Sequence, residues 1–193
     1  MNQAAIRFAS LMVLMFMMAC GGGAAPAAES TTTPTAEAAP ASGWQTFSPE
    51  GEGFSVEFPA TPVSAQEDLG EGVMQRQYVY ESPDQTVAYI VAVVHRATPA
   101  TAEETPELLQ RAYQAMAQME GAQAQPPEAV TASGHSGIGF VMQGVSEGQT
   151  VIFITKMFVH GNKFIQFMAV VDPAQQEAAQ AGVERFLNSI ALQ

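Results

Sequence analysis

The segment 134–139, Gly-His-Ser-Gly-Ile-Gly, comes closer to a catalytic motif than any other stretch of this sequence. A nucleophile elbow requires the pattern G-x-S-x-G, in which the serine sits on a sharp strand-to-helix turn. Here Ile138 stands where the second glycine belongs, so the pattern is broken. The dinucleotide-binding pattern G-x-G-x-x-G fails too, because Met142 occupies its last position. We therefore predict a glycine-rich turn between two strands here, and no catalytic residue.

Three histidines, His95, His135 and His160, are the natural candidates for transition-metal ligands. No two of them have the i, i+2 or i, i+4 spacing that places two ligands on one face of a strand or helix. The single cysteine, Cys20, belongs to the N-terminal segment and is not free to complete a site. We therefore predict solvent-facing histidines near strand ends, with no metal and no cofactor.

Two pairs of neighbouring carboxylates, at 67–68 and 103–104, are the candidates for acid–base chemistry. The first pair falls in a predicted loop and the second at the start of a predicted helix, where negative charge interacts favourably with the helix dipole. We interpret both as solvated, structural groups. The prediction is that the chain is not an enzyme, although an acid–base pair assembled only by the fold stays open.

The first twenty residues are typical of an export signal. Arg7 precedes twelve uncharged, mostly apolar residues at 8–19, and a helix of that length spans about 18 Å, too short for a hydrocarbon core of ~30 Å. The next motif, Met17-Met18-Ala19-Cys20, resembles the lipobox of bacterial lipoproteins. That resemblance implies cleavage before Cys20 and acylation of its thiol. An ordinary signal peptide with an unmodified thiol is the alternative.

Acyl chains of the palmitate type on Cys20 would hold the protein on a membrane, with the rest of the chain outside the cytoplasm. Gly21 rather than Asp follows Cys20, which favours the outer membrane if the host has one. Residues 21–42 consist only of Gly, Ala, Pro, Ser, Thr and Glu, and such a composition cannot form a core. We therefore predict three parts: a signal peptide at 1–19, a lipidated cysteine with a flexible tether at 20–42, and a globular domain at 43–193.

The charge balance argues against one class of partner. The chain has seven Lys and Arg against nineteen Asp and Glu, a formal net charge of −12. Removing the signal would also remove Arg7. Nucleic acids would repel such a chain, so they are excluded as partners.

The pattern of apolar residues after Trp44 predicts an antiparallel sheet covered by helices, an α+β fold. Strict alternation at 54–58 indicates a half-buried strand, and Gly161-Asn162 is typical of a two-residue hairpin turn. Predicted strands span 44–48, 54–58, 73–81, 86–95, 129–133, 138–144, 150–160 and 163–171. One helix is predicted from a Thr105 cap to Gly121, and a second from Asp172-Pro173 with Gln175 in a capping box.

The opening of the domain resembles that of the PsbP-like superfamily. The shared residues are Trp44 and Phe47, followed by Gly-Phe-Ser-Val-Glu-Phe-Pro at 53–59 and Pro62, and the closing Phe186-Leu187-x-Ser189-Ile190 is similar to the family's last helix. The group includes the extrinsic photosystem II subunit, Ran-binding Mog proteins and bacterial lipoproteins. The resemblance implies an α/β/α sandwich and a role as an assembly or binding subunit.

Three functions follow from these observations. The first is a membrane-anchored, non-catalytic interaction or assembly module in the cell envelope, with an unidentified protein partner. The second is a binding protein for a small apolar ligand or a cation. The third is a hydrolase, for which the sequence offers no complete set of residues.

Overall fold

The structure is a computed structural model that describes residues 43–193 except positions 71 and 120. The predicted signal peptide at 1–19, Cys20 and the tether at 20–42 lie outside the described residues. Within the described part, no helix is long and apolar enough to cross a membrane.

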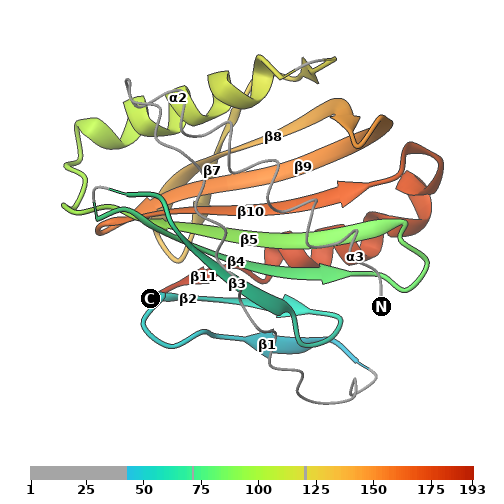
Figure 1. The fold of residues 1–193 in the computed structure, drawn as a ribbon, viewed down its shortest axis with the longest axis horizontal. Coiled ribbons are helices and arrows are strands. Elements are labelled where there is room, and N and C mark those ends of the chain that lie inside the picture. Colours follow the sequence, from blue (N-terminus) through green and yellow to red (C-terminus); the bar gives the residue numbers. More distant parts are fainter. Residues whose placement is uncertain (1–42, 71, 120) are drawn as a thin grey trace.

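A large antiparallel sheet organises the domain (Figure 1). Its strands run in the order β3 (Val63–Asp68), β4 (Met74–Glu81), β5 (Val87–His95), β10 (Lys163–Val171), β9 (Gln149–His160), β8 (His135–Ser146) and β6 (Gln123–Ala124), and β7 (Glu128–Ala132) also pairs with β8. Consecutive hairpins build each half of this order. The two halves meet where β5 pairs with β10, strands far apart in the sequence.

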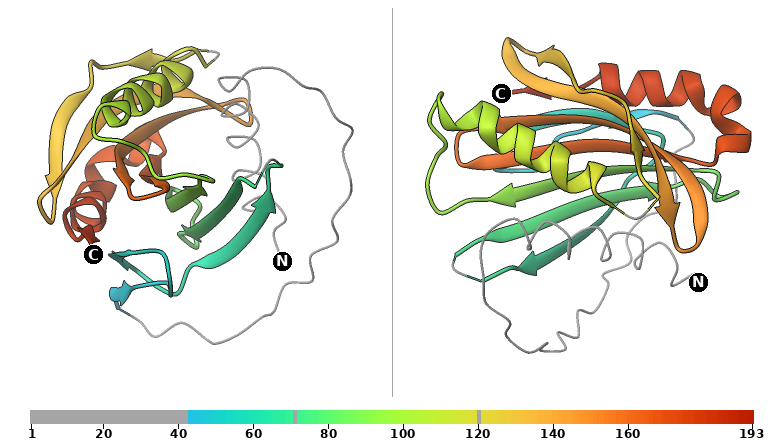
Figure 2. Two further views of the ribbon diagram at one scale, coloured as in Figure 1. Left: turned by 90° about the vertical axis from the view of Figure 1, so that its left-hand side faces the viewer. Right: turned by 90° about the horizontal axis from the view of Figure 1, so that it is seen from above.

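Two layers cover the large sheet. Helix α2 (Glu104–Ala117) packs over one face, against β8 and β9. The other face carries helix α3 (Gln176–Asn188), which follows a short 3-10 turn η2 (Pro173–Gln175), and a small sheet of β1 (Gln45–Phe47), β2 (Phe54–Phe58) and β11 (Ala191–Leu192) (Figure 2). The predicted α+β sheet with helices on both sides is confirmed, and a small sheet shares the second layer with α3.

Alternation along the central strands separates two apolar cores. In β5, Val91 and Val93 face α3 and the small sheet, whereas Ile90 and Val94 face the side of α2. Aromatic rings fill the α3 side, with Phe58 and Phe186 in an edge-to-face contact at 5.3 Å between ring centroids. Each fully buried ring of this kind contributes about 1.5–3 kcal/mol. These rings fix α3 and β2 against the large sheet.

Most predicted elements occur where the sequence placed them. The strands at 54–58 and 163–171 have the predicted bounds, and the Gly161-Asn162 turn is confirmed because His160 pairs with Lys163. The prediction of a loop at 67–68 is wrong, since both residues belong to β3, in which every residue is exposed and no alternation marks the strand. The two-residue strands β6 and β11 were also missed.

The helix starts differ in detail from the prediction. Thr105 does not cap α2, whose N-cap position is Glu103. Just before it, the Thr101 hydroxyl accepts the Glu104 N–H at 3.2 Å, and the Glu104 carboxylate accepts the Thr101 N–H at 2.9 Å. At the second helix, the Asp172 carboxylate accepts the Ala174 N–H at 2.8 Å, which confirms Asp172 as the start signal. The capping box with Gln175 is wrong, because the Asp172 N–H donates to the Thr86 carbonyl instead. The α-helix proper begins only after η2.

Candidate functional site

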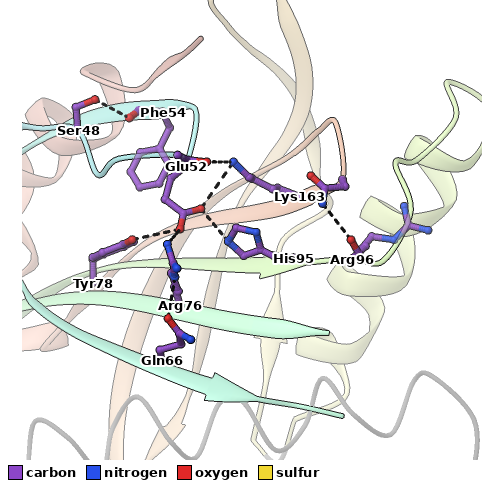
Figure 3. A network of polar contacts seen from close by, with 11 residues as sticks. Ser48, Glu52, Phe54, Gln66, Arg76, Tyr78, His95, Arg96 and Lys163 are labelled. Atoms are coloured by element: carbon purple, nitrogen blue, oxygen red, sulfur yellow. Dashed lines mark hydrogen bonds and ion pairs between the residues drawn. The ribbon is translucent and has the colours of Figure 1, made fainter. Parts of the chain in front are cut away.

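A buried carboxylate, Glu52, is the centre of the most concentrated group of ionisable side chains in the described domain (Figure 3). Glu52 lies in the turn between β1 and β2 and is 0% exposed. Gly51 and Gly53 on either side have φ values of +77° and +72°, which glycine adopts without strain. This backbone turns the carboxylate inward, over the end of the large sheet.

Four side chains surround the Glu52 carboxylate. Arg76 donates from Nη1 to Oε1 at 2.7 Å, and the Tyr78 hydroxyl lies 3.5 Å from the same oxygen. His95 Nε2 is 2.9 Å and Lys163 Nζ 3.9 Å from Oε2. The approach of His95 lacks the alignment of a hydrogen bond, so Oε2 has no directed hydrogen bond within the described residues and lies near the Lys163 ammonium group.

Strand parity explains why these groups converge. Lys163 has the same parity as Ile165 and Phe167 in β10, which belong to the core under α3. His95 pairs directly with Lys163 in the register of β5 and β10. The sheet therefore presents both side chains on one face at its end, beneath the turn that carries Glu52.

The ion pairs perturb the ionisation of their members in consistent directions. The hydrogen bond to Glu52 raises the pKa of Arg76 above its ordinary value, since the bond favours the charged form. Burial, with the negative charge of Glu52 as a smaller contribution, raises the pKa of Tyr78. Arg76 therefore stays charged and Tyr78 stays protonated at neutral pH, and both remain available to Glu52.

Lys163 ties the network to the main chain. Its ammonium group donates to the carbonyl oxygen of Gly51, and Arg76 also donates from Nε to the amide oxygen of Gln66 at 3.0 Å. A buried charge is costly unless it is paired, and here the pairing partners come from three adjacent strands. The network thus fastens the β1–β2 turn onto the large sheet.

The remaining two histidines lie at the same end of the sheet. His135 opens β8 and His160 ends β9, and their rings meet edge to face at 4.6 Å between centroids. His160 is next to Lys163 in the β9–β10 ladder. The expectation of separate, solvent-facing histidines is wrong, because none of the three is fully exposed and the strand order brings them to one face.

Comparison with known proteins identifies the fold of the described domain. No protein-family model and no curated protein matches the chain. Among solved structures, cyanobacterial PsbP (CyanoP) from Synechocystis sp. PCC 6803 is similar with a TM-score of 0.56 and 10% sequence identity, over 82% of this chain and 98% of that one. The described domain has the PsbP-like fold.

Two further structures give lower scores. The first is LpqN, involved in cell envelope biogenesis of Mycobacterium tuberculosis, with a TM-score of 0.46 and 11% identity over 68% of this chain and 85% of that one. The second is the Ran-binding protein Mog1p of Saccharomyces cerevisiae, with a TM-score of 0.45 and 12% identity over 79% and 96%. At 10–12% identity, no site residue carries over from any of these three proteins.

The segment 134–139 begins in a turn and continues as a strand. The turn falls on Ser133-Gly134, with φ values of +49° and +82°, and β8 begins directly afterwards. Ser136 is exposed within this strand and faces Thr131 of β7, not a helix start as in a nucleophile elbow. A turn between two strands is confirmed, but it is confined to Ser133-Gly134; the prediction is wrong for 135–139, which belong to β8.

One member of each carboxylate pair has a structural partner. In β3, Asp68 accepts the Gly70 N–H at 2.8 Å. At the start of α2, the hydrogen bonds from Thr101 lower the pKa of Glu104. Within 43–193, positions 71 and 120 aside, no group of three or more His, Cys, Asp or Glu side chains is arranged to hold a metal ion.

Sequence reasoning missed Glu52, Arg76 and Lys163. For Lys163 the sequence contains a usable signal. A lysine at a strand position whose neighbours of the same parity face the core needs a nearby anion, because an unpaired buried charge is costly. Arg76 gives the same signal in β4, where it shares the parity of the buried Tyr78. Glu52 gives no such signal, because a glutamate between two glycines is typical of an exposed turn.

Proposed function

We propose that this chain is a lipid-anchored envelope protein whose PsbP-like domain acts by binding a protein partner and performs no catalysis. The observation that carries the proposal is the closure of the Glu52 network. The domain's densest group of ionisable side chains is directed inward, and its carboxylate is 0% exposed and paired with Arg76. A general base or nucleophile must instead reach a substrate atom.

Two sequence features support the rest of the proposal. The lipobox-like motif ending at Cys20 favours a membrane anchor, and the segment 21–42 is suited to a spacer. A tethered domain meets a membrane-bound partner at a raised effective concentration, which compensates for a modest affinity. The PsbP-like resemblance, with its assembly and binding subunits, agrees with a module that works by contact.

The anchor is tested by the variant Cys20→Ser. The native chain should fractionate with membranes and yield an acylated N-terminal peptide beginning at Cys20 in mass spectrometry. The variant should remain unprocessed or be released from the acylated pool. An unmodified Cys20 in the native peptide, or cleavage at another bond, contradicts the anchor while leaving the partner hypothesis intact.

The partner is tested by cross-linking in the intact envelope, followed by purification of the native chain in detergent. We expect one or a few proteins to be enriched over a control lipoprotein that carries the same anchor. In parallel, the purified chain is screened for hydrolase turnover with the variants Ser136→Ala, His135→Ala and His160→Ala. Turnover that any of these substitutions abolishes would overturn the non-catalytic assignment.

A further inference from the structure

The ring pair of His135 and His160 has open hydrogen-bonding capacity. The register that pairs Gly137 with Phe158 places His135 opposite His160 on the same face of β8 and β9. Neither imidazole has a hydrogen-bond or ion-pair partner among the residues that the structure describes; their mutual ring contact is the interaction found. Two adjacent imidazoles with free nitrogens can supply two of the ligands of a metal ion.

An oxygen donor faces the same space. Gly53 has no side chain, and a β-carbon built there would lie 3.8 Å from Nε2 of His160 and 3.5 Å from the main-chain oxygen of Gln193. The nitrogen and the oxygen thus border one gap that any other residue at position 53 would fill.

Residues 192 and 193 are fixed against the residue that precedes β2 and against the turn that precedes β8. The Gln193 N–H donates to the Gly53 carbonyl at 2.9 Å, and the Leu192 N–H donates to the Ser133 hydroxyl at 3.2 Å. Ser133 belongs to the turn that leads into His135. These contacts hold the oxygen near the start of β8, and the pairing of β8 with β9 places His160 beside His135, which limits the reorganisation needed to bind a ligand.

We propose that His135 and His160 bind a divalent first-row transition-metal ion, with the Gln193 main-chain oxygen and water completing its coordination. Imidazole nitrogen suits Cu²⁺ and Zn²⁺, whereas Mg²⁺ and Ca²⁺ require oxygen ligands. The site takes Cu²⁺ more tightly than Zn²⁺, in the general order of stability for such donors. The proposal does not depend on the function proposed above.

Local charge does not oppose this ion. Lys163 neighbours His160 in the ladder, but its ammonium group is directed to the Gly51 carbonyl and the Glu52 carboxylate (Figure 3). The formal net charge of −12 over the whole chain attracts cations at long range. A cation can therefore approach the pair without first displacing a resident positive charge.

Binding is measured on the purified full chain in detergent, free of any histidine tag. Titration with ZnCl₂ should shift the imidazole proton resonances of His135 and His160 and leave those of His95 in place. One equivalent of CuSO₄ should give an electron paramagnetic resonance spectrum with coupling to two imidazole nitrogens. MgCl₂ at the same concentration should produce neither change.

Substitutions complete the test. His135→Ala and His160→Ala should each weaken Zn²⁺ binding at least about tenfold, since even residues that only support a ligand contribute 10–100-fold. The matched control is His95→Gln, which changes the third histidine and should retain the affinity and the copper spectrum. Unshifted His135 and His160 resonances in the unmodified chain, or unchanged Zn²⁺ affinity in the double variant His135→Ala/His160→Ala, would overturn the proposal.

Discussion

The Glu52 network and the His135–His160 pair lie at the same end of the large sheet and on the same face, but they differ in burial and in how their polar atoms are satisfied. Glu52 is fully buried, so its charge must be neutralised by groups inside the protein, and Arg76 and Lys163 serve that purpose. The two imidazoles are only half-buried, and water can satisfy them. Burial therefore closes the first group to ligands and leaves the second one open.

The largest effect that this comparison predicts is the loss of Glu52. Glu52→Ala should lower the free energy of unfolding by about 3–5 kcal/mol, because it removes the anion with which both Arg76 and Lys163 are paired. His135→Ala on the same sheet face should cost less than about 1 kcal/mol. Urea unfolding followed by the fluorescence of Trp44, the single tryptophan, measures both. Equal losses in the two variants would remove the distinction between a closed and an open group.

A smaller effect is expected at Gly137, which lies two residues from His135 in β8. A methyl group there would collide with the main-chain oxygen of Met157 and lie 2.5 Å from the Phe158 ring, so β9 would have to move. Gly137→Ala should destabilise the domain by about 1–3 kcal/mol.

The matched control for Gly137 is Gly139→Ala, on the same face of the same strand. There the nearest atom to a new β-carbon is a Val130 methyl at 3.0 Å, a side chain that can adjust. Thermal unfolding of both variants gives the comparison. A larger loss at Gly139 than at Gly137 would mean that the close approach of β8 and β9 is not what requires glycine.

An exposed ion pair provides the contrast to Glu52. Arg185 donates from Nε to Glu57 at 2.6 Å, and these side chains are 51% and 30% exposed. Glu57→Gln should therefore cost about 1 kcal/mol or less, and less still in high salt. Arg185 also lies over the Trp44 ring at 5.1 Å, so a double-mutant cycle with Arg185→Gln is needed to isolate the ion pair. A coupling energy as large as the loss at Glu52 would contradict the role of burial.

The smallest predicted effect on stability concerns Tyr89. It is negligible at neutral pH and appears only at alkaline pH. Burial, with a smaller contribution from Tyr80, raises the pKa of Tyr89 to about 12. Above pH 10 the unfolded chain loses the phenolic proton while the folded chain retains it. The stability that depends on this proton is present below pH 10 and is lost as the pH rises towards 12.

Tyr89→Phe should reduce the decline in unfolding free energy between pH 10 and pH 12, with little change at pH 7. Part of the decline should persist, because Tyr78 also has a raised pKa. Urea unfolding at several alkaline pH values measures the slope. An unchanged slope in Tyr89→Phe would show that this phenol is not the group responsible.

Local patterns determined much of this protein. The alternation at 54–58, the Gly161-Asn162 turn and the start signal at Asp172 were predicted from the sequence and are confirmed, as is the α+β class with the PsbP-like fold. Each of these depends on residues a few positions apart. Backbone propensity and side-chain parity act over that range, so a single sequence records them.

Only the tertiary structure decided which side chains meet. Parity puts His95 and Lys163 on a face of their strands, but it does not say that β5 and β10 pair, nor that β8 and β9 place His135 opposite His160. Strand order results from the packing of whole elements around two cores. Several strand orders compete, and no local sequence pattern encodes which of them is the most stable. For the same reason Glu52, an unremarkable turn residue in the sequence, becomes the most buried charge in the described domain.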